Sequence, residues 1–369
     1  MLISIIICER CIHYYSFLKN DKARYCYVRY AEALGMGNER AMKRVMKRVM
    51  KAIQNQASHD QGLSDLQKGY GFALAAALIW AGFILVSRMG GISELLAFDV
   101  IAIRYATCAS ILLPIWWFKY RFTLFTPRLI ICSLVGGLAY ALCAFSGFQW
   151  SSASHAAILL PGMMPLFIIV LSFLINKESH SAQKWLGIGV ITLGIIVLFA
   201  GELGVFNGAI TFNVTTLLGD GWLVAAAFFW AVFSVLIKRW QITPWQVTVS
   251  LALLTCLFYL PVYIVFLPKG LSAASWTDIL LQAFYQGVMA TIVQMIFYVK
   301  AVQKIGPSNM GAVMSIVPVI SGLAAIVIFN ELITVELIMG LVLVSLGAWL
   351  AHSRYIERRN TLRKSLDAN

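Results

Sequence analysis

The sequence predicts an all-α integral membrane protein with ten transmembrane helices, arranged as two inverted repeats of five helices. Three observations support this fold class: the composition, ten apolar runs of membrane-spanning length, and an internal repeat. Of the 369 residues, 60% are apolar and only 12% are charged, and the mean hydropathy is +0.80. Soluble domains contain about 45–50% apolar and about 25% charged residues. The composition therefore argues against a soluble enzyme.

Each expected helix is an apolar run of the length that a bilayer requires. A helix needs about 20 apolar residues to cross the hydrocarbon core. The ten runs are Tyr70–Val86, Leu95–Trp117, Leu129–Gln149, Ala156–Ile175, Trp185–Ala200, Trp222–Ile237, Val247–Leu267, Ile279–Tyr298, Met310–Phe329 and Leu337–Ala351. The rest of the chain forms short loops and two basic tails, residues 1–68 and 353–369.

The N-terminal tail carries no clear targeting or metal-binding signal. The apolar run Leu2–Cys8 is seven residues long and has no basic region before it, so neither a signal peptide nor a span is expected. Cys8 and Cys11 lack the second ligand pair of a structural zinc site. The basic stretch Arg40–Lys51 could lie on an anionic leaflet as an amphipathic helix. We favour the alternative that the tail is disordered or precedes the true start of synthesis.

The distribution of positive charge predicts the orientation, because cytoplasmic loops are enriched in Lys and Arg. With both termini inside, the outer loops hold only Arg88 and Lys269. The inner loops hold Lys119, Arg121, Arg128, Lys177, Lys184, Lys238, Arg239, Lys300 and Lys304. We therefore expect a multi-pass protein of the cell inner membrane with both termini in the cytoplasm. The net charge of +13 is split between tails and loops, which indicates orientation rather than a nucleic-acid partner.

The two halves of the chain repeat one another. At an offset of 150 residues, Gly69, Gly71, Trp80, Ala81 and Phe83 recur as Gly219, Gly221, Trp230, Ala231 and Phe233. At an offset of 153 residues, Pro165, Glu178, Gly187 and Gly194 recur as Pro318, Glu331, Gly340 and Gly347. Since each repeat has an odd number of spans, the second is inserted upside down. Inverted repeats are typical of secondary transporters, whose substrate site lies near the midplane between the halves.

These residues resemble the EamA branch of the drug/metabolite transporter superfamily. The resemblance rests on the two Trp-Ala pairs, on Arg104 in the second span, and on the repeated Pro, Glu and Gly signature, and it covers residues 69–201 and 217–352. It implies a central cavity surrounded by spans 1, 3, 4, 6, 8 and 9. The candidate lining residues in these spans are Trp80, Tyr140, His155, Trp230, Tyr285, Gln286 and Gln294. Alternatively, such aromatic residues form interfacial belts and such glutamines bond a neighbouring helix.

Arg104 is the one basic residue placed deep within an expected span. It lies nine residues into that span, which corresponds to a depth of about 14 Å. A charge near the bilayer centre costs about 2.5–3.5 kcal/mol on insertion scales. Arg104 could bind an anionic substrate group or counter a proton site. It could instead have a structural role, bonding backbone carbonyls or pairing with an acid, for which Asp220 is better placed than Asp99.

Other repeated residues suggest gating or packing. Pro161, Pro165 and Pro318 are expected to interrupt spans 4 and 9, where they would free carbonyls or allow bending. Glu178 and Glu331 follow these spans, and either gate the transporter or, as we favour, stabilise a helix start. The glycine pairs of spans 5 and 10 suit close helix packing within one chain or in a homodimer. Leu251 stands near the position that matches Arg104, so the halves are not chemically equivalent.

The five histidines are scattered and no H-E-x-x-H, G-x-S-x-G or Walker motif occurs, so neither an enzyme nor an ATP-driven pump is expected, and no cofactor or metal is implied. We expect a secondary transporter that exports small polar metabolites, amino-acid-like compounds or drugs by alternating access. The alternative is a non-transporting receptor or scaffold on the same fold.

Overall fold

The structure, a computed structural model, describes residues 39–119, 121–177, 180–203, 205 and 213–352. The chain forms two compact units, Met1–Asp65 and Leu66–Asn369. The described residues of the first unit, 39–65, belong to helix α3 (Glu39–Gly91), whose later residues are the first helix of the second unit. The basic stretch from Arg40 to Lys51 is therefore helical, whereas residues 1–38 lie outside the described part of the chain.

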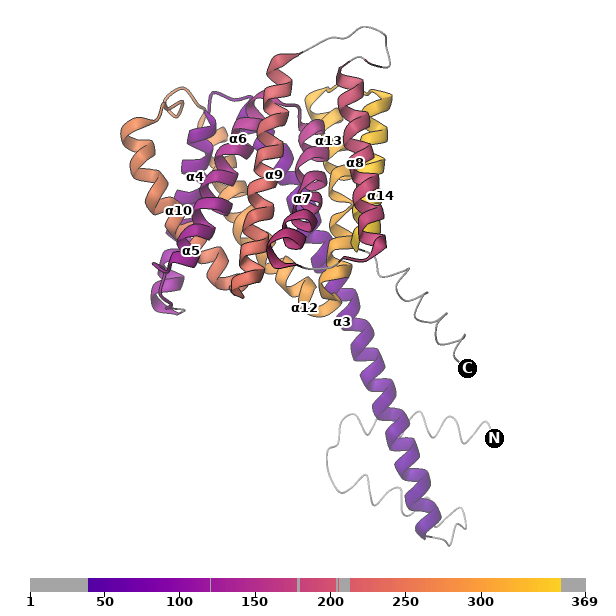
Figure 1. The fold of residues 1–369 in the computed structure, drawn as a ribbon. Coiled ribbons are helices and arrows are strands. Elements are labelled where there is room, and N and C mark those ends of the chain that lie inside the picture. The colour runs from indigo at the N-terminus through magenta and orange to yellow at the C-terminus, as the bar shows by residue number, and fades with distance from the viewer. Residues whose placement is uncertain (1–38, 120, 178–179, 204, 206–212, 353–369) are drawn as a thin grey trace. The chain divides into compact units, whose positions relative to one another are not determined.

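All regular secondary structure in the described part of the second unit is helical, and loops join the helices (Figure 1). Nine of its helical stretches are long and apolar enough to cross a membrane, and the shorter apolar stretch Val335–Ala351 provides the tenth. Their order confirms the predicted all-α membrane fold. The elements are α4 (Ala97–Phe118), α5 (Pro127–Cys132), η1 (Ser133–Ala139), α6 (Tyr140–Trp150), α7 (Ala153–Asn176), α8 (Ala182–Glu202), α9 (Val214–Trp240), α10 (Pro244–Phe266), α11 (Trp276–Gln282), η2 (Ala283–Val293), α12 (Gln294–Met314), α13 (Val317–Phe329) and α14 (Val335–His352).

The helix ends follow local sequence signals. Ser152 begins α7 by accepting a hydrogen bond from the amide of His155 at 3.0 Å, which satisfies one of the unpaired amides of the first turn. Lys177 and Asn330, which correspond at the offset of 153 residues, end α7 and α13 in the left-handed region with φ of 54° and 53°. The repeat is therefore visible in the backbone at the ends of these two helices.

Two π-helical segments interrupt the third and eighth spans at corresponding positions. η1 begins at Ser133 and η2 begins at Ala283, an offset of 150 residues. A π-helical turn inserts an extra residue, which rotates the following side chains and frees backbone carbonyls to accept hydrogen bonds from other groups. Such turns are frequent at functional sites. The amino-acid sequence does not predict these segments, because their apolar pattern does not differ from that of ordinary membrane helices.

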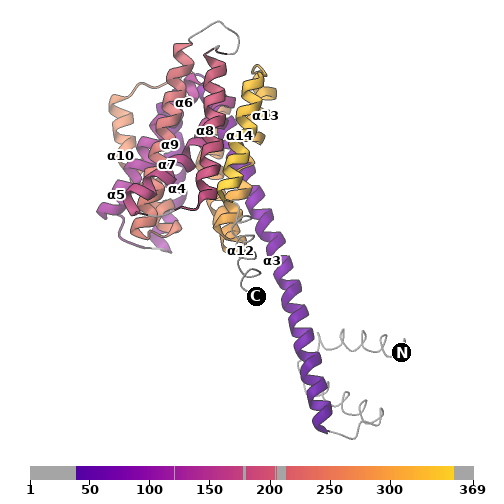
Figure 2. The same ribbon diagram turned by 45° about the vertical axis from the view of Figure 1, so that its right-hand side comes forward.

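Helix α8 packs along α14 in both views (Figures 1 and 2). A Cβ added at Gly347 would lie 2.6 Å from the carbonyl oxygen of Gly187 and 2.7 Å from the amide nitrogen of Ile191. A side chain at either glycine would separate the two helices. The structure thus uses these glycine faces for packing within one chain.

The prolines of the fourth and ninth spans have different positions in their helices. Helix α7 continues through Pro161 and Pro165, so the expected interruption of span 4 is not seen. Pro318 lies in the first turn of α13, directly after α12 has ended. A proline is accommodated in a first turn because its missing amide has no intrahelical partner there.

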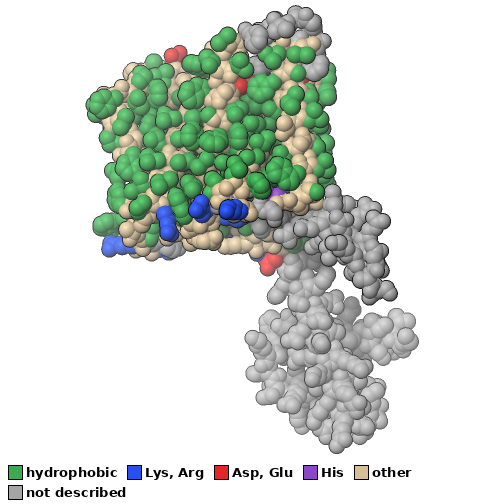
Figure 3. All heavy atoms as spheres, in the orientation of Figure 1, with side chains coloured by type: hydrophobic (Ala, Val, Ile, Leu, Met, Phe, Trp, Pro, Cys, Tyr) green, Lys and Arg blue, Asp and Glu red, His purple; other side chains and the backbone are tan. Residues whose placement is uncertain are grey.

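Apolar side chains cover the visible face of the second unit, and Lys and Arg side chains gather along one rim (Figure 3). Large apolar side chains are exposed along many of the helices, including Leu174, Leu186, Val265 and Val327. In a soluble protein such a belt would be a very large apolar patch. Lipid contact explains it.

Candidate functional site

The side chain of Arg104 lies buried between the two repeats. It comes from α4 of the first half and retains 8% of its accessible surface. Its Nη1 donates to Oε1 of Gln286, from η2 of the second half, over a long distance of 3.5 Å. Gln286 is itself fully buried and donates to the hydroxyl of Ser87 at 3.0 Å. This polar chain therefore links α4, η2 and α3.

Three aromatic rings surround the guanidinium. The Cζ atom of Arg104 lies 5.5 Å from the ring centroid of Phe83, 5.7 Å from that of Tyr105 and 5.9 Å from that of Phe145. A cation at these distances is attracted by the ring quadrupole, by about 0.5–1 kcal/mol at exposed sites and about 2 kcal/mol when desolvated. The rings come from α3, α4 and α6, so the first repeat supplies the apolar part of the site.

Arg104 has no acidic partner among the described residues. Its Nε atom is buried without a hydrogen-bond partner there. Asp220, the acid proposed from the sequence as a partner, instead contacts His155 and Ser151. Asp99 accepts hydrogen bonds from the Tyr263 hydroxyl at 2.5 Å and, at 2.8 Å each, from two backbone amides. The guanidinium is thus a buried cation with neutral partners and spare donors, an arrangement that favours an anion.

The π-helical segments position the contacts of this site. Gly287 of η2 lies against α4, where an added Cβ would be 2.6 Å from the Cβ of Thr107. Gly137 of η1 accepts a hydrogen bond from the Tyr105 hydroxyl at 3.0 Å. The corresponding surface of α10 carries Leu251, whose Cγ lies 3.4 Å from the Cβ position of Gly137. The repeat therefore builds two similar helix crossings, α4–η2 and α10–η1. A cation lies at the α4–η2 crossing, and Leu251 lies at the α10–η1 crossing.

Some of the predicted lining residues come together and others do not. Tyr140 and Trp230, from opposite halves, lie with their ring centroids 4.9 Å apart. The Tyr285 hydroxyl donates to the carbonyl of Ile79 at 3.1 Å. Trp80 packs half-buried against the main core, and Gln294 is half-buried at the first residue of α12.

Several residues in contact with Arg104 or with Gln286 were not predicted from the sequence. Phe83, Tyr105, Phe145 and Ser87 were not proposed as site residues. One signal was available, because the repeat pairs Phe83 with Phe233, whose ring lies 5.2 Å from that of Trp230. The other three residues carry no local signal that separates them from ordinary core positions.

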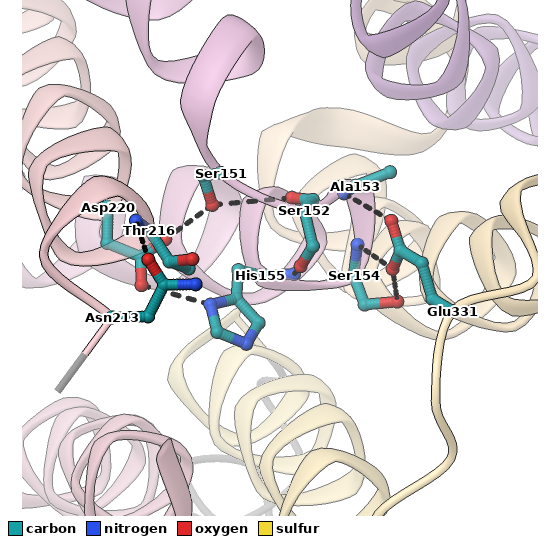
Figure 4. Close-up of polar contacts among 9 residues, drawn as sticks. All are labelled: Ser151, Ser152, Ala153, Ser154, His155, Asn213, Thr216, Asp220 and Glu331. Carbon is teal, nitrogen blue, oxygen red and sulfur yellow. Dashed lines mark hydrogen bonds and ion pairs between the residues drawn. The ribbon is translucent and has the colours of Figure 1, made fainter. Parts of the chain in front are cut away.

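A second polar cluster surrounds the turn between α6 and α7 (Figure 4). The Asp220 carboxylate of α9 accepts from the Ser151 hydroxyl and lies 2.9 Å from Nδ1 of His155. The Glu331 carboxylate, which follows α13, accepts from the amides of Ala153 at 2.7 Å and Ser154 at 2.9 Å, and from the Ser154 hydroxyl. We call this group of side chains the α6–α7 cluster.

The contacts of Glu331 refine its predicted role. Its carboxylate accepts hydrogen bonds at a helix start, and this helix is α7 of the opposite repeat rather than the next helix of its own. A carboxylate at a helix N-terminus pairs with unsatisfied amides and with the positive end of the helix dipole. Glu178, the residue that matches it in the first repeat, lies outside the described residues.

The EamA-like transporter family matches residues 67–200 and 217–352, which are the two sets of helices described above. The chain belongs to this family. Two similar proteins are uncharacterized transporters, YoaV of Bacillus subtilis and one from Clostridium kluyveri. YoaV is 21% identical over 62% of this chain and 77% of its own length. The Clostridium protein is 24% identical over 81% of this chain and 97% of its own.

A crystal structure with 20% sequence identity has the same fold, with a TM-score of 0.52 over 78% of this chain and 96% of that one. The EamA fold, the apolar helices and the family membership make this chain a multi-pass membrane transporter. Transport is the activity for which the family is described, which argues against an enzymatic activity.

Proposed function

We propose that this EamA-like transporter exports small organic anions with an apolar body, such as amino-acid-like compounds, across the cytoplasmic membrane. The single observation that carries the substrate class is Arg104, a buried cation with neutral partners, an unpartnered Nε and three aromatic neighbours. A carboxylate would pair with the guanidinium in a bidentate geometry. The rings of Phe83 and Phe145 would contact the apolar body.

The location of this site supports an alternating-access mechanism. Arg104 and Gln286 belong to opposite repeats, so a substrate that pairs with the guanidinium and with Gln286 would contact both halves at once. Rocking of the halves would then expose the same site to each side in turn, as in other inverted-repeat transporters. The proposed orientation, with both termini in the cytoplasm, follows from the basic loops and from the basic rim in Figure 3.

The substrate class can be tested in two steps. First, cells that produce the wild-type chain, Arg104→Gln or no transporter are compared for intracellular and exported metabolites. Compounds that change are then measured by counterflow in liposomes that contain the purified protein. Arg128→Gln is the matched control, because it removes the same charge from an exposed position.

We expect the exported compounds to carry a carboxylate or another anionic group, and their counterflow to fall at least tenfold in Arg104→Gln. A tenfold loss corresponds to about 1.4 kcal/mol, the lower end of what a charged hydrogen bond contributes. Arg128→Gln should behave as the wild type does. Transport of cations or neutral compounds only, or unchanged counterflow in Arg104→Gln, would refute the proposal.

A further inference from the structure

The α6–α7 cluster contains a titratable pair, His155 and Asp220, that has no part in the Arg104 site described above. Asp220 of α9 is fully buried, and its Oδ2 lies 2.9 Å from Nδ1 of His155, whose side chain retains 17% of its accessible surface. His155 belongs to the first repeat and Asp220 to the second. The pair therefore joins the two repeats.

The helices approach each other closely at this point. A Cβ added at Gly219, the residue before Asp220, would overlap with the backbone of Trp150 and Ser151. The Ser151 hydroxyl donates to the second oxygen of the Asp220 carboxylate. The carboxylate thus sits in a tight, water-poor contact, where its charge is stabilised mainly by the two groups that bond to it.

The neighbouring charged groups already have other partners. Nη1 of Arg88, from α3, donates to the carbonyls of Phe148 at 2.8 Å and Gln149 at 3.0 Å, at the C-terminal end of α6, and its guanidinium is attracted to Glu331. Glu331 bonds the first amides of α7. Among the described residues of the α6–α7 cluster, His155 is the ionisable one that contacts the Asp220 carboxylate.

Binding of one proton changes the charge of this pair. When the imidazole is neutral, its Nδ1–H can still donate to Asp220, but the pair carries one negative charge in a buried contact. When the imidazole of His155 is protonated, the pair is an imidazolium and a carboxylate with no net charge. Histidine changes charge between pH 5 and 8 in ordinary surroundings. A buried carboxylate without a compensating charge favours any conformation that admits water.

We propose that His155 and Asp220 form a proton-binding site. Its occupancy holds α7 and α9 together and keeps closed the face of the transporter that carries the α6–α7 turn. Protonated, the pair stabilises the closed face. Deprotonation leaves the charge of Asp220 uncompensated, and the face opens to water. Closure is thus favoured at low pH and lost as the pH rises. The inference rests on the proposed alternating access, since opening of this face is one of its two required states.

The test measures opening directly and needs no substrate. Nitroxide labels are placed at Ile92 and Val214, which are 57% and 63% exposed, after the seven cysteines have been replaced. Ile92 directly follows Gly91, which contacts the Phe148 carbonyl, so this label reports on the α6–α7 turn. Val214 begins α9. The distance between the labels is measured by pulsed electron paramagnetic resonance between pH 5 and 8 in lipid nanodiscs.

In the wild type we expect the population with the longer distance to grow as the pH rises. For one linked proton, the ratio of the open to the closed population should increase by up to about tenfold per pH unit. His155→Asn retains a donor near the Nδ1 position but cannot be protonated, so it should favour the open population at every pH. Asp220→Asn removes the negative charge and should stay closed at every pH. His180→Asn, a histidine that bonds Ser172 at 2.8 Å elsewhere in the fold, should titrate as the wild type does.

The proposal is wrong if the wild-type distances do not change with pH, or if His155→Asn or Asp220→Asn retains the wild-type titration. Should one of these variants fail to fold, as judged by size-exclusion chromatography, the other decides the result. A failure here is distinguishable from a failure of the proposed substrate class, because the labels report conformation while the Arg104 experiment reports flux.

Discussion

Replacing Arg104 with leucine separates a binding role from a structural one. Leucine is the residue that the second repeat carries near the corresponding position, where Leu251 is well buried. The perturbation therefore introduces a side chain that this type of helix crossing already accommodates. It removes the one buried cation of the α4–η2 crossing.

The expected change in stability follows from the contacts of the guanidinium. Removing a charge from the membrane interior recovers about 2.5–3.5 kcal/mol, to which leucine adds about 0.3–0.6 kcal/mol. Against this, the ring contacts of the guanidinium are lost, and Oε1 of Gln286 loses its donor, at a cost of about 1–3 kcal/mol. These terms nearly cancel, so we expect the free energy of unfolding to change by less than about 2 kcal/mol. Removing one partner of a buried ion pair would cost about 3–5 kcal/mol.

The assay is equilibrium unfolding of purified protein in mixed micelles, followed by tryptophan fluorescence, together with liposome counterflow of the exported compound. We expect near-wild-type unfolding and no counterflow in Arg104→Leu. A loss of more than about 3 kcal/mol would identify Arg104 as a structural residue. Full counterflow with unchanged affinity would exclude it from the substrate site.

Three further predictions concern packing, a buried carboxylate and topology. Gly347→Ala should destabilise the protein by about 1–3 kcal/mol, because the added methyl group overlaps with the backbone of α8; Gly189→Ala, which meets no atom within 4 Å, should change the unfolding free energy by less than about 0.5 kcal/mol. Tyr263→Phe removes one of the three donors to the Asp99 carboxylate and should cost about 1.5–3 kcal/mol in the same unfolding measurement; a change below 0.5 kcal/mol, about the scatter of surface substitutions, would contradict this. A single cysteine at Phe125, which is 62% exposed, should react with an impermeant maleimide only from the cytoplasmic side, and labelling from outside would overturn the proposed orientation.

The contact between Glu331 and α7 could not be predicted from the sequence. The repeat identified the residue and a helix-start role was expected, but the helix that it stabilises belongs to the other repeat. The two residues of this contact are separated by 178 positions in the chain. No local pattern indicates which of ten helix starts a carboxylate will reach.

The pairing of Asp220 shows the same limit. Its position near the end of a span made it a reasonable partner for Arg104, since both are charged residues within apolar surroundings. The structure instead brings it to His155 and Ser151. Which charges meet depends on the rotation of each helix about its axis, and that rotation is set by packing with neighbours.

The amino-acid sequence by itself determined the all-α membrane fold, the order of the spans and the repeat, because burial of apolar residues in lipid and the length of a spanning helix are local requirements. Only the tertiary structure decided the π-helical segments, the aromatic surroundings of Arg104 and its pairing with Gln286, which lies 182 residues away. The rings around Arg104 come from helices of its own repeat and Gln286 comes from the opposite repeat. The energy of a buried charge depends on the groups that surround it in space, and the local sequence does not specify those groups.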